Sequence, residues 1–469
     1  MGLKTFKVDF EKLNTKESLR LWIPFTLPNS KYKYDKFVNF LSLCESGSRP
    51  KGGITAEDDG EAISLGGEQI GKDGSLDLSK IPYVPFEFYE NSTRGKVKDK
   101  DILICKDGAL TGKTCLVDFS LFPSKEVMVN EHVYIIRGNS EINQQFLFYF
   151  TRTNIFQLQI QDLAFKKKAQ PGLNTDHLKK IKIPLIPKNI QEKLINKIKP
   201  FEEIIYELTN RIIPQQEVIN KVFTNEFGFN IKKFEELKKI RKYYIDLFAF
   251  GNNKDIRQSV KFHREAGLFV VQELKSITNK KIKNFISEPI VLGSSVSPSN
   301  YDDDGDYFYI SMANIKNWKF EGEDSLLVSK EYSDSNKNKT VSKDDILIAR
   351  SGEGTIGKVA LIDDEDLKGI FADFTMRIRL QSYNPLFAYY YFRTEYFQYL
   401  VEVNKKGLGN NTNIFPSQIQ EFPLIDIPLK AQQKIVNKIK EELDKQEEIK
   451  SKIESERKKI DKIIEESVI

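Results

Sequence analysis

The chain contains the same sequence plan twice. Matching segments recur in the same order over about 100 residues, and the later pairs share one offset of 241 residues, from 152 to 393 and from 191 to 432. Chance similarity between Lys- and Ile-rich segments would not keep this order, and the repeat is far longer than the unit of a solenoid. Each copy is therefore a whole domain followed by a tail. The matched pairs, in chain order, are DILICKDG (101–108) with DILIARSG (345–352), GKTCLVD (112–118) with GKVALID (357–363), RTNIFQ (152–157) with RTEYFQ (393–398), and QEKLINKIK (191–199) with QQKIVNKIK (432–440).

Each copy has the pattern of an α+β domain. Short β-branched and aromatic runs separated by Gly, Asp and Asn predict strands. An aromatic-rich stretch follows, FLFYFTRTNIFQL in the first copy and LFAYYYFRTEYFQYL in the second. We interpret it as a core helix whose aromatic side chains pack under the strands. A loop rich in Lys, Gly and Asn and a short strand bounded by prolines come next. The expected fold class is α+β, with two tandem similar globular domains separated by long helices.

The tail of each copy has the spacing of a coiled-coil seam. From Leu194 to position 222 the apolar residues alternate at intervals of four and three, with one interruption, and a similar isoleucine stripe runs through 439–463. This pattern predicts two long antiparallel coiled-coil helices that pack on each other. Pro200 and Pro214 each remove a backbone donor, so the first helix should be kinked or broken into two or three pieces.

Composition excludes several classes of protein. The chain has 72 Lys and Arg against 67 Asp and Glu, a net charge of +5, which argues against a uniformly basic nucleic-acid binder. The three cysteines form no CxxC pair, as expected for reduced thiols in a cytoplasm. Neither a signal-peptide core nor a run near the ~18 apolar residues of a membrane span is present. We expect a cytoplasmic protein that does not enter membranes.

Three motifs imitate enzyme signatures. Gly352–Gly357 fits GxGxxG, but the strand-like KVALID follows it where a dinucleotide site needs a helix. The partner Gly108–Thr114 imitates a P-loop but has Asp107 where that motif needs glycine. We interpret both loops as glycine turns of a hairpin. Asn384–Phe387 resembles the NPPF motif of adenine methyltransferases without its second proline, and we interpret it as a helix start.

The sequence offers no convincing active site or metal site. His132, His177 and His263 are isolated from one another and from the cysteines. The acidic runs 57–59 and 302–304 lie in turns flanked by glycine and fit solvated loops. We therefore expect no catalytic residue, no cofactor and no bound metal.

One loop of each copy has the residues that groove recognition requires. Both loops lie just before the proline-bounded strand and combine cations for phosphates, Gln or Asn for base edges, and glycine for close backbone approach. Either loop alone would also fit an ordinary surface turn, but the recurrence favours contact with DNA. The candidate DNA-binding residues are Lys166, Lys167, Lys168, Gln170 and Asn174 in the first copy, and Lys405, Lys406, Asn410, Asn411 and Asn413 in the second.

The duplicated plan resembles the specificity subunits of type I restriction-modification systems. Ala169–Asn174, Ile183–Pro187 and the following Gln191 look like that family's passage from a target-recognition domain into a conserved helix. The stretch from Asn413 to Gln433 repeats it, and the DILI hairpin is similar to the family's in both copies.

The resemblance implies a non-catalytic subunit that reads a bipartite site in double-stranded DNA. Each target-recognition domain would read one half of the site. The helices would set the spacing and dock two DNA methyltransferase subunits, which restriction subunits would then join. The expected parts are a first recognition domain (1–187), a first helical spacer (188–240), a second recognition domain (241–427) and a second helical spacer (428–469).

Two alternatives remain open at this point. The first is the recognition subunit of a related type IIB or IIG-like restriction-modification enzyme whose catalytic half lies in another chain. The second is a structural coiled-coil adaptor that never meets DNA. Co-purified partners and the salt dependence of duplex binding separate the three hypotheses.

Overall fold

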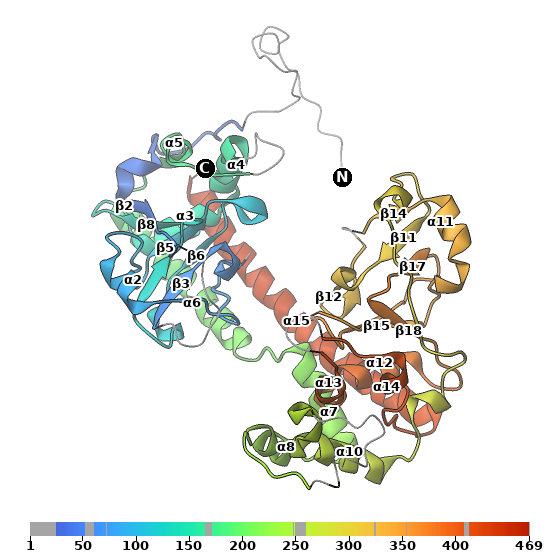
Figure 1. Ribbon diagram of the computed structural model, residues 1–469. Helices are drawn as coiled ribbons and strands as arrows, with labels where there is room; N and C mark the ends of the chain where they lie inside the picture. Colours follow the sequence, from blue (N-terminus) through green and yellow to red (C-terminus); the bar gives the residue numbers. More distant parts are fainter. Residues whose placement is uncertain are drawn as a thin grey trace. The chain divides into compact units, whose positions relative to one another are not determined.

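The computed structural model divides into two compact units, which we describe one at a time. Unit 1 comprises Met1–Arg211 and Lys450–Ile469, and unit 2 comprises Ile212–Ile449. Unit 1 is therefore made of two segments that lie at opposite ends of the sequence. The structure describes residues 25–51, 61–71, 73–164, 171–246, 248, 259–322, 325–352, 354–407 and 412–468 (Figure 1).

Unit 1 is built on two packed sheets. A four-stranded antiparallel sheet has the order β2-β8-β5-β6, and a three-stranded sheet has the order β4-β3-β7, in which β3 is parallel to β7. Successive side chains of β5 point to opposite faces. Leu103 and Cys105 join the core between the sheets, whereas Ile102 and Ile104 join the core under the helices. The strands are β1 (Tyr34–Lys36, paired with β9), β2 (Leu41–Ser46), β3 (Ala62–Leu65), β4 (Tyr83–Val84), β5 (Ile102–Cys105), β6 (Thr114–Leu116), β7 (Val127–Val129), β8 (Val133–Gly138) and β9 (Lys182–Pro184).

Unit 2 repeats this arrangement. Its four-stranded sheet has the order β10-β18-β15-β16, and its three-stranded sheet the order β14-β11-β17, with β11 parallel to β17. Leu347 and Ala349 of β15 lie in the core between the sheets, and Ile346 and Ile348 lie in the core under the helices. The strands are β10 (Val291–Leu292), β11 (Tyr307–Ile310), β12 (Ile315–Lys316, paired with β13), β13 (Lys319–Phe320), β14 (Leu327–Val328), β15 (Ile346–Ala349), β16 (Val359–Leu361), β17 (Gly369–Phe371) and β18 (Thr375–Ile378).

The aromatic-rich stretch forms two consecutive helices in each unit. These are α3 (Gln144–Arg152) and α4 (Asn154–Ala164) in unit 1, and α12 (Pro385–Arg393) and α13 (Glu395–Asn404) in unit 2. The expected single helix is thus wrong in one detail, because Thr153 and Thr394 adopt extended backbone between the helices. The prediction that the aromatic side chains are core is confirmed: Phe150, Phe156, Phe387, Tyr391 and Phe397 are fully buried.

The helix start predicted at Asn384 is confirmed. The Asn384 side chain accepts hydrogen bonds from the N–H groups of Leu386 and Phe387, and Asn143 caps α3 in the same way. Shorter or additional helices complete the two units. They are α2 (Phe86–Asn91) and α5 (Thr175–Leu178) in unit 1, and α8 (Ile231–Lys238), α10 (Glu265–Ile277), α11 (Lys330–Ser335) and α14 (Pro416–Ile419) in unit 2.

The first long helical segment is broken once. It forms α6 (Lys188–Thr209) and α7 (Gln215–Phe227), whereas the C-terminal segment is the continuous helix α15 (Leu429–Val468). Pro214 stands directly before α7, where the missing proline N–H costs no helical hydrogen bond. Pro200 remains inside α6, so only one of the two prolines lies at the break. None of the described helices has an apolar stretch long enough to cross a bilayer.

A buried glutamine ties the start of each long helix to its own unit. Gln191 of α6 accepts a hydrogen bond from the N–H of Asn143 at 2.7 Å and donates one to the carbonyl of Ile186 at 2.7 Å. Gln432 of α15 makes the equivalent two bonds in unit 2, at 2.8 Å each. Because both ends of each amide are paired, the glutamine fixes the helix against the cap of α3 or α12.

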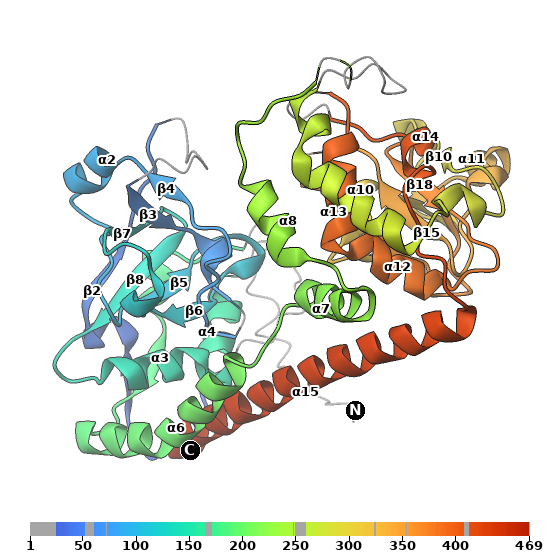
Figure 2. The same ribbon diagram turned by 90° about the horizontal axis from the view of Figure 1, so that it is seen from below.

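The final helix of each repeat completes the unit of the other repeat. The C-terminal part of α15 lies beside α6 (Figure 2). Its Ile460 and Ile464 belong to the core of unit 1, with 3% and 0% of their surface exposed. Ile219 and Phe223 of α7 are fully buried in the core of unit 2. These positions are related by the repeat offset of 241 residues, from 219 to 460 and from 223 to 464. The two copies have therefore exchanged the last parts of their helical tails, while the first part of α15 stays in unit 2.

Candidate nucleic-acid interface

The hairpin turn after β5, and its repeat after β15, is shaped by glycines. Gly112 and Gly357 have φ of +88° and +85°, values that only glycine adopts without strain. Their N–H groups donate to the carbonyls of Cys105 and Ala349 at 2.9 and 2.8 Å. The next element is a strand in both units. The interpretation of both GxG-like motifs as hairpin turns is confirmed, because each loop joins two antiparallel strands and is followed by β6 or β16, where a nucleotide site needs an α-helix.

The end of the candidate DNA loop docks on this hairpin turn. In unit 1, Asp107 forms a bridge with Gly172, and the N–H of Leu173 donates to the carbonyl of Lys106 at 2.7 Å. In unit 2, Ser351 forms the bridge with Asn413, and the following residue donates to the carbonyl of Arg350 at 2.9 Å. The two chain segments that sequence analysis singled out separately are thus held side by side.

The candidate DNA-binding residues are distributed unevenly over the described structure. Asn174 caps α5, since its side chain accepts from the N–H of His177 at 2.9 Å. The Lys405 ammonium pairs with Glu402 at 2.6 Å. Lys406 and Asn413 exchange two backbone hydrogen bonds of 2.7 Å. Lys166, Lys167, Lys168, Gln170, Asn410 and Asn411 lie outside the described residues.

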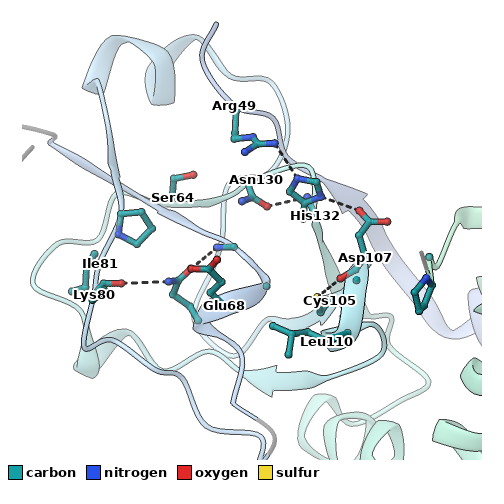
Figure 3. Close-up of a pocket in the computed structure, with 18 residues that line it drawn as sticks. Arg49, Ser64, Glu68, Lys80, Ile81, Cys105, Asp107, Leu110, Asn130 and His132 are labelled. Atoms are coloured by element: carbon teal, nitrogen blue, oxygen red, sulfur yellow. Dashed lines mark hydrogen bonds and ion pairs between the residues drawn. The ribbon is translucent and has the colours of Figure 1, made fainter. Parts of the chain in front are cut away.

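A cavity of about 860 Å³ opens beside the hairpin turn of unit 1 (Figure 3). The cavity lies between the ends of β3, β5 and β7. Pro171 and Gly172, at the end of the candidate DNA loop of unit 1, form part of its wall. Ser64 and Asn130 give the wall polar groups, and the Ser64 hydroxyl is buried without a hydrogen-bond partner among the described residues. A volume of this size is typical of a binding site for a small group or part of a larger ligand.

Four charged or titratable side chains form a hydrogen-bonded chain at this cavity. Asp107 Oδ2 lies 2.9 Å from His132 Nδ1, and His132 Nε2 lies 3.0 Å from Arg49 Nη2. Arg49 Nε donates to Glu131 Oε1 at 2.5 Å. Burial alone would raise the pKa of Glu131, but a backbone hydrogen bond and Arg49 outweigh it and lower the pKa. Sequence analysis missed this cluster because its three segments, at 49, 107 and 131–132, lie far apart along the chain, and His132 was considered only as a metal ligand, isolated from the other histidines and from the cysteines.

The equivalent positions in unit 2 carry larger side chains than Ser64 and Gly67. Matching the strand registers places Tyr309 at the position of Ser64 and Phe374 at that of His132. Met312 replaces Gly67, and Ser295 stands where unit 1 has Arg49. Burial raises the pKa of Tyr309, whose hydroxyl donates to the carbonyl of Ser294 at 2.9 Å. The two units therefore share a frame but present different chemistry beside the same turn.

The side chain of Phe374, beside the hairpin turn of unit 2, is exposed to solvent. It is 44% exposed, and the Arg350 guanidinium lies 5.8 Å from its ring centroid and 5.6 Å from that of Phe415. In the described part of the chain, no group of three or more His, Cys, Asp or Glu side chains could hold a metal ion. The three cysteines, Cys44, Cys105 and Cys115, are free thiols.

A known protein family matches this chain in two separate regions. The family model described as "Type I restriction modification DNA specificity domain" matches residues 76–217 and 290–458, more than half of the chain. The chain belongs to this family. One specificity-domain match begins in unit 1 and the other lies largely in unit 2, and each includes one of the two hairpins with its docked loop.

Several solved structures are similar to this specificity-domain chain at 13% sequence identity. One, described as "Structural basis underlying complex assembly and conformational transition of the type I R-M system", covers 95% of this chain and 99% of its own, with a TM-score of 0.45. A type I restriction-modification S subunit from M. genitalium covers 94% and 97%, with a TM-score of 0.36. The HsdS subunit from Thermoanaerobacter tengcongensis covers 95% and 98%, with a TM-score of 0.32. No curated protein matches the chain.

Proposed function

We propose that this protein is the sequence-specific DNA-binding subunit of a type I restriction-modification complex. Each recognition domain reads one half of a bipartite site in double-stranded DNA. The observation that carries the proposal is the duplicated frame, in which two matching hairpins hold two matching loops and present different side chains. A protein with two such surfaces is suited to a site whose two halves differ in sequence.

In this proposal the paired loops supply the DNA contacts. The lysines bind phosphates, which gives affinity on any sequence, while Gln and Asn side chains contact base edges. The contacts fall on Lys166, Lys167, Lys168, Gln170 and Asn174 on one half-site, and on Lys405, Lys406, Asn410, Asn411 and Asn413 on the other. Because Asn174 already caps α5 and Lys405 already pairs with Glu402, these two contribute less than their neighbours.

The helices have a separate role in the proposal. The recognition domains end near residues 187 and 427, just before α6 and α15 begin. The long helices set the spacing between half-sites, pair as an antiparallel coiled coil, and dock two DNA methyltransferase subunits in the cytoplasm. Restriction subunits then join. The chain itself has no catalytic role and needs no cofactor, because its partners supply the chemistry.

Duplex binding against salt concentration tests the DNA-binding part of the proposal. The full chain, purified with its co-expressed partners, should lose affinity steeply and log-linearly as salt rises, because phosphate contacts release counterions. A flat salt response would support the adaptor hypothesis instead. The chain alone, incubated with plasmid and labelled S-adenosylmethionine or with ATP and Mg²⁺, should neither methylate nor cut, and turnover that tracks the pure chain would contradict the non-catalytic role. Co-purification with a separate methyltransferase supports a type I complex, and a fused nuclease-methyltransferase supports the type IIB or IIG-like alternative.

A further inference from the structure

The cluster at the cavity of unit 1 lies directly beside the loop proposed to bind phosphates. Asp107 pairs by backbone with Gly172, the described end of that loop, and by side chain with His132. His132 in turn contacts Arg49 (Figure 3). A DNA backbone held by the loop would therefore bring a groove close to the Arg49 guanidinium.

The hydrogen bonds within the cluster fix the direction of Arg49 and leave donors available. If Asp107 accepts from Nδ1–H of His132, then Nε2 is an acceptor for Arg49 Nη2–H. Arg49 Nε–H is used by Glu131. Glu131 Oε1 also contacts Nη2, so of the five N–H donors of the guanidinium the two on Nη1 remain for a ligand. The Arg49 side chain is 41% exposed, which makes those donors accessible to a ligand.

The charge of the cluster argues for base recognition and against phosphate binding. The cluster holds two carboxylates, Glu131 against Arg49 and Asp107 against His132, and one guanidinium, so its charge is not positive when His132 is neutral. A phosphate would be repelled by those carboxylates. A base edge carries no net charge, and it requires a donor whose orientation is fixed. Guanine presents two acceptors, O6 and N7, in the major groove, and these are the base atoms that arginine N–H donors contact most often.

We propose that Arg49 reads a guanine in the half-site of unit 1, with His132 and Glu131 as positioning residues that hold its guanidinium. This assignment rests on the proposed function and deepens it. Unit 2 has Ser295 at the position of Arg49 and exposes Phe374 at the position of His132, so it lacks both the arginine and the histidine of this cluster. The cluster is thus one physical reason why the two half-sites differ.

Mapping of modified bases in the host genome tests the assignment. The chromosomal gene is deleted and replaced by the wild-type chain, Arg49→Gln, Arg49→Lys, His132→Ala or Lys125→Gln. Lys125 is an exposed cation at the opposite end of β7 from the cavity, so its replacement removes the same charge elsewhere on unit 1. The wild-type chain should give a bipartite motif with a required guanine in one half. Melting temperatures of the purified complexes check that each variant is folded.

Loss of that guanine requirement is the expected result. Both Arg49 variants should accept other bases at this one position, because lysine keeps the charge but loses the fork. In competition binding on duplexes that differ only at that base pair, the preference for guanine should fall about 5- to 150-fold. His132→Ala should relax the same position by a smaller factor, and Lys125→Gln should leave the motif unchanged.

The contrary outcomes are distinct from one another. If folded Arg49 variants keep every position of a gene-dependent motif, or weaken binding equally on all sequences, the assignment is overturned while the proposed function stands. Relaxation at a position other than guanine also overturns it. If the wild-type gene produces no gene-dependent motif, the proposed function fails and the assignment fails with it.

Discussion

Exchange of the final helices predicts that a mutation near the C-terminal end of the chain destabilises the unit formed mainly by its first half. Ile460→Ala removes three carbons from a side chain that is 3% exposed in the core of unit 1. At about 0.8 kcal/mol per carbon the lost burial is about 2.4 kcal/mol. The cavity left behind brings the total to about 3–4 kcal/mol, within the range known for buried Ile→Ala changes.

Hydrogen exchange followed by mass spectrometry shows which unit loses stability in the variant. Amides of β5, β8 and α3 that exchange through opening of unit 1 should exchange on the order of 100- to 1000-fold faster in Ile460→Ala. The matched control is Ile219→Ala, which lies 241 residues earlier and is fully buried in unit 2. It should accelerate β15, β18 and α12 instead. Faster exchange of unit 2 in Ile460→Ala, or of unit 1 in Ile219→Ala, would refute the exchanged arrangement.

Three further predictions address binding, spacing and pH. Replacing Lys166, Lys167 and Lys168 with Gln should weaken binding to all duplexes and flatten the plot of log affinity against log salt by up to about three units of slope, and an unchanged slope in a salt titration would remove that loop from the DNA. Inserting one heptad into α15, with a matching insertion in the first helical segment, adds about 10 Å of helix, and selection from a duplex library should yield half-sites about three base pairs further apart but otherwise the same. Hydrogen bonds from Lys281 and Lys283 lower the pKa of Glu421 from 4.5 to about 2, so these ion pairs stabilise unit 2 fully above about pH 4.5 and are lost as pH falls toward 2. Glu421→Gln should therefore reduce stability at pH 7 by roughly 1 kcal/mol or less and make thermal unfolding between pH 4.5 and 2 less pH-dependent than in the wild type.

Local features of the fold were predictable because local sequence decides them. Glycines in the DILI hairpins, the cap at Asn384 and the break at Pro214 each follow from the backbone preference of one residue. The break at Thr153 was not predicted, because its helical neighbours carry the same apolar pattern through it. At Pro200 a break was one of the predicted outcomes, but α6 continues past this residue.

Long-range relations were predictable only where the repeat made them visible. The loop that docks on the hairpin was identified because it recurs in both copies. One cluster occurs in the first copy alone and joins residues up to 83 positions apart, namely Arg49, Asp107, Glu131 and His132. No local sequence pattern therefore predicts it. Apolar stripes indicated helices with buried faces, but the spacing of apolar residues does not show which other element the buried face contacts. It could not show that Ile460 packs in unit 1 rather than in unit 2.

The end of α15 also meets the beginning of the described chain. The N–H of Lys31 donates to the carbonyl of Val468 at 3.2 Å, and the Ser30 hydroxyl donates to the same carbonyl at 2.6 Å. Residues 30–31 and the end of α15 are therefore neighbours in space, so the chain could be joined there and opened elsewhere without changing the order of its segments. A short linker from Val468 to Ser30 could close the chain into a ring, and the non-helical segment 241–246 could be cut to give new ends. Such a circularly permuted protein would keep both units, and each would still receive its last helix from the other half of the gene.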